Sequence, residues 1–132
     1  MTLIQTKPIS GITESVIEAY FESLNSGKFM TTANLFAVDG VLNPPFDSPV
    51  VGPEAIATYL QAEAQGMKLE PLKGTRETWE NQRTRINITG KVQTPLFSVN
   101  VAWTFIIKQT KEIELVEVNL LASLAELAKL RR

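Results

Sequence analysis

The spacing of apolar residues changes once along this chain, after Met67. Before that point apolar side chains recur with a helical period, which predicts helices over residues 13–24, 29–36 and 53–66. After it they alternate, which predicts strands over residues 83–93, 97–108 and 113–121 and a weaker strand over residues 72–79. Helices followed by strands indicate an α+β fold, with about three helices on the concave side of a curved antiparallel sheet.

The last predicted strand contains an irregularity. Its apolar phase switches from Ile113 and Leu115 to Val116 and Val118, which predicts a β-bulge. A bulged, curved sheet under helices encloses a conical cavity.

Three further segments complete the expected chain. The second helix is expected to stop at Asp39, before Gly40, and three prolines argue against a long strand interior in residues 42–49. Residues 122–132 are predicted to form a short amphipathic C-terminal helix. Residues 1–10 are expected to be a flexible arm before one domain over residues 11–132.

The composition removes several kinds of chemistry. Cysteine is absent, which excludes disulfides and thiol catalysis. Histidine is also absent, and no suitably spaced carboxylate cluster replaces it, so we expect no metal site. The net charge of -1 gives no reason to expect a nucleic-acid partner. No signal peptide or membrane-length apolar run is apparent, so a cytoplasmic protein is expected.

Two side chains place a single hydrogen-bond donor into an otherwise apolar stripe. Tyr20 lies on the apolar face of the first helix, and Trp103 lies in step with the apolar side chains of the second long strand. A buried donor without a partner costs roughly 1–3 kcal/mol. Both residues are therefore either core aromatics bonded to backbone carbonyls, or donors that face one cavity and hold a polar atom of an apolar ligand.

Several local strings carry a resemblance to known proteins. AYFESLNSG (residues 19–27) and LFAVDG (35–40) resemble the nuclear transport factor 2-like superfamily. The strings NPPFDSPVVG (43–52), MKLEP (67–71), GKVQTPLF (90–97) and LLAS (120–123) resemble the C-terminal domain of the orange carotenoid protein family. The chain is similar to stand-alone homologues of that domain, which lack the helical N-terminal half.

The resemblance implies a ligand and a site. The ligand would be a ketocarotenoid such as canthaxanthin or echinenone, bound non-covalently, and Tyr20 and Trp103 would donate hydrogen bonds to its ring carbonyl. The positions implied to line the tunnel are Leu24, Met67, Leu69, Phe97, Phe105 and Val118.

The resemblance also implies partners. A domain of this size has a radius of gyration of roughly 14 Å, too small to enclose a whole carotenoid. We therefore expect a homodimer that shares one pigment. It would take the pigment from a membrane and deliver it to helical carotenoid proteins, homologues of the missing N-terminal half, and the pigment would quench singlet oxygen.

Two other functions remain open. Ketosteroid-isomerase-like and dehydratase-like enzymes share the cone, and such an isomerase needs a carboxylate base beside an oxyanion donor. Tyr20 stands where the oxyanion tyrosine would fall, but Pro44, next to Asn43, stands where the base would fall. We therefore expect no enzyme activity. The second alternative is a pigment-free protein-interaction module, which would be colourless when purified from a carotenoid-producing host.

Overall fold

The computed structural model describes residues 9–79 and 81–121. The four long strands follow the three helices as the sequence predicts, but two further strands lie between the second and third helices. The helices are α1 (Ser15–Asn25), α2 (Phe29–Ala33) and α3 (Pro53–Glu63). The strands are β1 (Phe36–Asn43), β2 (Val50–Val51), β3 (Lys68–Thr78), β4 (Thr84–Gln93), β5 (Ser98–Ile107) and β6 (Ile113–Leu121). The predicted α+β class is confirmed.

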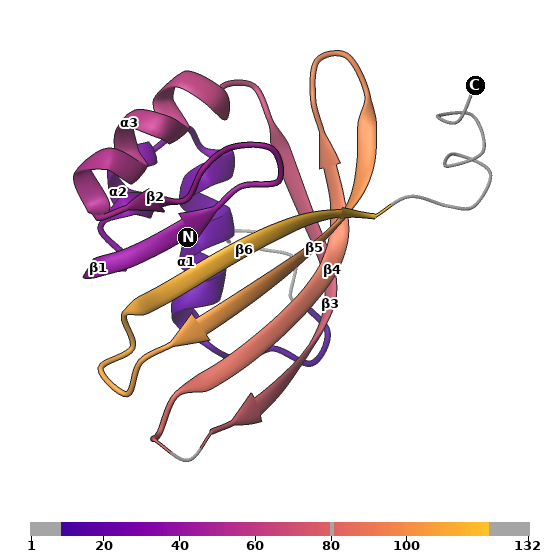
Figure 1. The fold of residues 1–132 in the computed structure, drawn as a ribbon. Coiled ribbons are helices and arrows are strands. Elements are labelled where there is room, and N and C mark those ends of the chain that lie inside the picture. Colours follow the sequence, from indigo (N-terminus) through magenta and orange to yellow (C-terminus); the bar gives the residue numbers. More distant parts are fainter. Residues whose placement is uncertain (1–8, 80, 122–132) are drawn as a thin grey trace, which may run out of the picture.

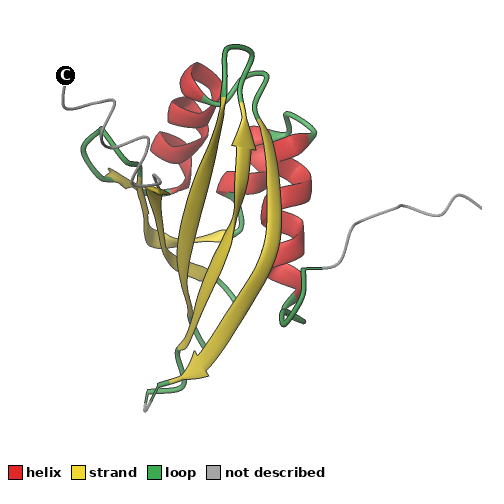
Figure 2. Cartoon of the chain, turned by 90° about the vertical axis from the view of Figure 1, so that its right-hand side faces the viewer, coloured by secondary structure: helices red, strands yellow, loops and turns green. Residues whose placement is uncertain are grey.

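The strands form one curved sheet in the order β2-β1-β6-β5-β4-β3. Figure 1 shows the helices on one side of this sheet, and Figure 2 shows the long strands in front of the helices. Every neighbouring pair is antiparallel except β1 and β6, which run parallel. The sheet is therefore mixed, whereas the sequence suggested a purely antiparallel one.

Strands β1 and β2 are the elements that sequence reasoning missed. The second helix ends at Ala33 rather than at Phe36, and the chain enters β1 where a stop at Asp39-Gly40 was expected. The pairing with β6 shifts between Phe36 and Val41, so the Asp-Gly step lies in an irregular stretch of the strand. Because β1 pairs with a strand more than seventy residues later in the chain, local propensity does not reveal it.

The predicted bulge in the last strand is confirmed. Ile106 pairs with Leu115 and Ile107 pairs with Ile113, so Glu114 is the extra residue. The bulge resets the phase of the strand, and Ile113 and Val116 are both fully buried.

The C-terminal end of helix α1 is held by backbone hydrogen bonds and in turn holds the start of β3. The amide of Gly27, which has a φ of 73°, donates to the Leu24 carbonyl, and the amide of Lys28 donates to the Ser23 carbonyl. This is a Schellman motif, and glycine suits its left-handed position. The side-chain amide of Asn25 then exchanges two hydrogen bonds of 2.7 and 2.8 Å with the backbone of Leu69, which ties the start of β3 to the end of α1.

The sequence predicts a flexible arm over residues 1–10 and a short helix over residues 122–132. Ile9 is buried and the Gly74 amide donates to the Ser10 carbonyl, so these two residues pack on the domain. Residues 1–8 and the predicted helix over residues 122–132 lie outside the described residues. Among the described residues, no helix has the length and apolar character needed to cross a membrane.

Candidate functional site: an apolar cavity with two hydrogen-bond donors

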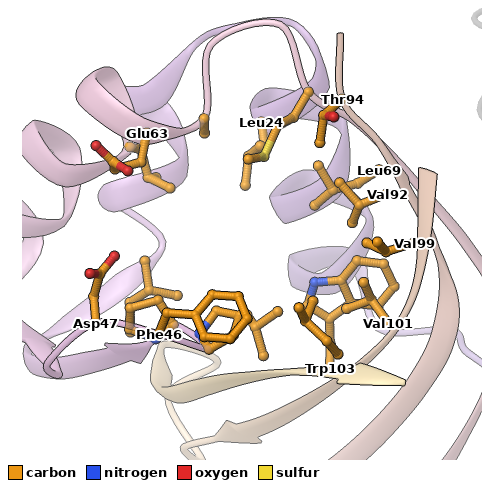
Figure 3. Close-up of a pocket in the computed structure, with 18 of the residues that line it drawn as sticks. Leu24, Phe46, Asp47, Glu63, Leu69, Val92, Thr94, Val99, Val101 and Trp103 are labelled. Carbon is orange, nitrogen blue, oxygen red and sulfur yellow. The ribbon is translucent and has the colours of Figure 1, made fainter. Parts of the chain in front are cut away.

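A cavity of about 280 Å³ lies between the concave face of the sheet and helices α1 and α3. Figure 3 shows its lining side chains pointing inward from both layers. The lining residues are Tyr20, Leu24, Leu42, Pro44, Pro45, Phe46, Asp47, Tyr59, Leu60, Glu63, Ala64, Met67, Leu69, Val92, Thr94, Phe97, Val99, Val101, Trp103, Val118 and Leu120. Ligand cavities commonly measure roughly 300–1,000 Å³, so this one suits part of a long molecule rather than all of it.

Exposure separates an inner end of the cavity from a mouth. Tyr20 and Trp103 are only 2% and 1% exposed. Phe46 is 85% exposed and Phe97 is 57% exposed, although both line the same cavity. The exposed lining residues, which surround the mouth, are Pro45, Phe46, Asp47, Glu63, Phe97 and Leu120.

The inner end contains two hydrogen-bond donors. Within residues 9–79 and 81–121, neither the Tyr20 hydroxyl nor the Trp103 indole nitrogen has a hydrogen-bond partner. Figure 3 shows the indole nitrogen on the edge of the Trp103 ring that faces the cavity. Neither donor is among the fully enclosed unpaired atoms of the described residues, so both border the open space of the cavity, where a ligand can bring an acceptor atom to them.

An aromatic cluster holds both donors in place. The Phe21 ring packs edge-on against Tyr20, with centroids 5.3 Å apart, and against Trp103, with centroids 4.9 Å apart. Phe105 packs edge-on against Tyr20 at 5.1 Å. Such contacts restrict the rings, so both donors are presented to the cavity in defined orientations.

The eight residues that the resemblance implied for the site are mostly brought together. Seven of them line the cavity: Tyr20, Leu24, Met67, Leu69, Phe97, Trp103 and Val118. Phe105 does not; it is 0% exposed and lies in the core behind Tyr20. Contact between these seven residues and a pigment remains a prediction.

Sequence reasoning missed the opposite wall of the cavity. Residues 44–47 follow β1 and contribute four consecutive lining residues, and α3 contributes Tyr59 and Glu63. The Tyr59 hydroxyl donates a 2.7 Å hydrogen bond to the Asp47 carboxylate. The paired prolines of residues 44–45 were a sign of a stiff loop, but nothing in the sequence indicated that it faces a helix twelve residues later.

The carboxylates that line the cavity lie at its mouth and not at its inner end. Asp39 is exposed on β1 and does not line the cavity. Asp47 and Glu63 line it from exposed positions. An isomerase-type base would have to lie beside the oxyanion donor, whereas these carboxylates lie at the mouth and Tyr20 lies at the inner end.

Burial of the Tyr20 phenol gives a pH prediction. Desolvation disfavours the phenolate, so the pKa of Tyr20 lies well above its usual range in the folded protein. The unfolded chain loses this proton first, near pH 10. The stability contributed by the neutral phenol is therefore present below about pH 10 and is lost as pH rises toward the folded pKa.

We expect Tyr20 to form no phenolate at about pH 10–11 until the protein unfolds, so the folded chain, which has two tyrosines, gains at most one phenolate. Near-ultraviolet absorbance and circular dichroism followed together would check this. Reversible formation of two phenolates per chain near pH 10 in a folded protein would contradict the burial of Tyr20.

The sequence and the fold correspond to a known domain family. The chain belongs to the nuclear transport factor 2 (NTF2) domain family, whose match covers residues 12–119.

Within that family the chain is similar to the C-terminal domain of orange carotenoid proteins. It is 40% identical over 126 residues to the orange carotenoid-binding protein of Limnospira maxima, which covers 92% of this chain and 40% of the relative. It is also 40% identical over 128 residues to that of Synechocystis sp., covering 94% of this chain and 40% of the relative. The chain thus spans about two fifths of the length of these relatives.

A solved structure matches in the same way. The orange carotenoid protein of Anabaena (Nostoc) sp., solved with canthaxanthin bound, superposes with a TM-score of 0.84 at 38% identity. The match covers 92% of this chain and 40% of that protein.

Proposed function

We propose that this chain binds the terminal ring of a ketocarotenoid in its cavity, non-covalently, with the ring carbonyl accepting hydrogen bonds from Tyr20 and Trp103. The observation that carries the proposal is the pair of donors at the inner end of an apolar cavity, neither of which has a partner among the described residues. A carbonyl is the one polar atom on such a ring, so two donors and apolar walls match its chemistry. The canthaxanthin bound by the Anabaena protein supports this ligand class.

We further propose that the pigment is shared by two copies of the chain. A cavity of about 280 Å³ encloses only part of a carotenoid. Pro45, Phe46, Phe97 and Leu120 place exposed apolar surface around the mouth, where a covering partner would bury it. In this proposal the homodimer takes pigment from a membrane, delivers it to helical carotenoid proteins and contributes to singlet-oxygen quenching through the pigment.

In this proposal the chain is a binding protein rather than an enzyme. Two observations support that choice: the relatives are carotenoid-binding proteins by name, and the carboxylates of the cavity lie at its exposed mouth instead of beside the two donors.

The test is to express the chain in a host that makes canthaxanthin, purify it, and measure absorbance, extracted pigment and mass by light scattering. We expect a coloured dimer with one pigment for two chains. A colourless protein would refute pigment binding and favour a protein-interaction module. A coloured monomer would refute only the shared pigment.

A further inference from the structure

The loop over residues 44–49 contributes residues 44–47 to one wall of the cavity and makes a side-chain hydrogen bond to α3 near its centre. Its ends are fixed by the pairing of Leu42 with Val50 between β1 and β2. In the part of the chain that the structure describes, the only side-chain hydrogen bond made by residues 44–49 joins Asp47 to Tyr59. The loop is therefore anchored at both ends by strand pairing, and by one side-chain hydrogen bond in between.

That contact joins the two sides of the mouth. Asp47 lies among the exposed lining residues of the loop, and Tyr59 lies on α3, one turn before the mouth residue Glu63. Figure 3 shows Phe46 and Asp47 on one side of the cavity and Glu63 on another, facing the same space. Separating Asp47 from Tyr59 would let the loop, with Phe46, move away from the helix.

The hydrogen bond between Tyr59 and Asp47 is strong enough to hold the loop against α3 and exposed enough to break reversibly. The bond is a 2.7 Å O–H···O contact to a carboxylate, which is stronger than a bond between neutral groups. Partial burial, which is the largest cause, and the hydrogen bond to Asp47 raise the pKa of Tyr59 above its usual range. The hydroxyl therefore keeps the proton that it donates. Asp47 is exposed, so water replaces the bond when it breaks.

We propose that the Tyr59–Asp47 hydrogen bond is a latch that controls the rate at which a bulky apolar group passes the mouth of the cavity. The inference rests on the proposed function for the nature of that group, the terminal ring of a carotenoid. A ring is wider than the polyene behind it, so the latch must open for entry and for exit but closes again around the chain of the bound pigment. Tyr59 and Asp47 are positioning residues here, since they act through the loop.

The first arm of the test needs no pigment. The chain has two tryptophans, so a Trp79→Phe background leaves Trp103, inside the cavity, as the sole indole. We expect Tyr59→Phe in this background to raise the acrylamide quenching constant of Trp103 by about twofold or more, because local opening exposes the ring. Asp47→Asn, which keeps an acceptor, should give a smaller rise.

The matched control is Thr58→Ala. It also removes a hydroxyl from α3, but the Thr58 hydroxyl donates to the Glu54 carbonyl of the same helix and does not face the cavity. All variants are compared in the Trp79→Phe background. Equal quenching with and without Tyr59→Phe, or an equal rise in Thr58→Ala, would overturn the latch.

The second arm measures pigment exchange with phosphatidylcholine vesicles that contain canthaxanthin. We expect Tyr59→Phe to speed both uptake and release by about tenfold, the effect of lowering a barrier by about 1.4 kcal/mol, with an unchanged absorption maximum. A shifted maximum at unchanged rates would overturn the latch, since the pair would then act on the bound pigment. If no variant takes up canthaxanthin while the quenching result holds, the proposed function fails and the latch stands.

Discussion

The double variant Tyr20→Phe/Trp103→Phe should lose the preference of this chain for ketocarotenoids over carotenoids without a carbonyl. Each hydrogen bond contributes about 0.5–1.5 kcal/mol, so the ratio of affinities for canthaxanthin and β-carotene should fall on the order of 10- to 100-fold. The reason is that β-carotene leaves both donors of the unmodified protein unpaired, whereas phenylalanine has no donor to leave unpaired. Competitive loading from vesicles, followed by extraction and chromatography, would measure the ratio.

The control for this experiment is Tyr59→Phe, which removes a phenol hydroxyl from the same cavity but from its mouth. Its ratio of affinities should stay within about twofold of the unmodified protein, because neither ligand uses that hydroxyl. Selectivity that survives in the double variant, with the fold intact by circular dichroism, would show that other groups recognise the carbonyl.

Phe105→Ala should lower the free energy of unfolding by about 3–5 kcal/mol. Phe105 is fully buried and packs edge-on against Tyr20 and Phe21, so its removal leaves a hole behind the ring that presents the donor. This is a large share of the roughly 5–15 kcal/mol that stabilises a typical domain. Urea unfolding of the pigment-free protein would measure it. Phe105→Leu, which removes less volume and should therefore cost less, serves if the alanine variant does not fold.

Phe97→Ala is the matched substitution at the mouth. Phe97 is 57% exposed and lines the cavity, so its removal should cost less than about 1 kcal/mol of stability while it weakens retention of pigment. The two phenylalanines therefore separate packing from ligand contact. Similar losses of stability for Phe97→Ala and Phe105→Ala would contradict the assignment of Phe105 to the core and Phe97 to the mouth.

The inner end of the site was predictable because its signals are local. Tyr20 interrupts an apolar stripe with helical spacing, and Trp103 interrupts one with alternate spacing, so each could be recognised within its own element. The bulge in β6 was predictable for the same reason, since the change of phase occurs within four residues.

The outer wall was not predictable in this way. The strand β1 depends on parallel pairing with β6, and the loop after it faces α3 through the contact between Asp47 and Tyr59. Phe105 was predicted to line the cavity, and this prediction is wrong. It lies on the same face of β5 as Trp103, but it is buried in the core and does not border the cavity.

The sequence by itself determined the α+β class, most element boundaries and the two donors, because hydrophobic period and turn chemistry act over a few residues. Only the tertiary structure decided which of the inward-facing side chains border empty space and which loop closes it. A cavity is the volume left between layers that are distant in the chain, and its size depends on how the helices pack on the curved sheet.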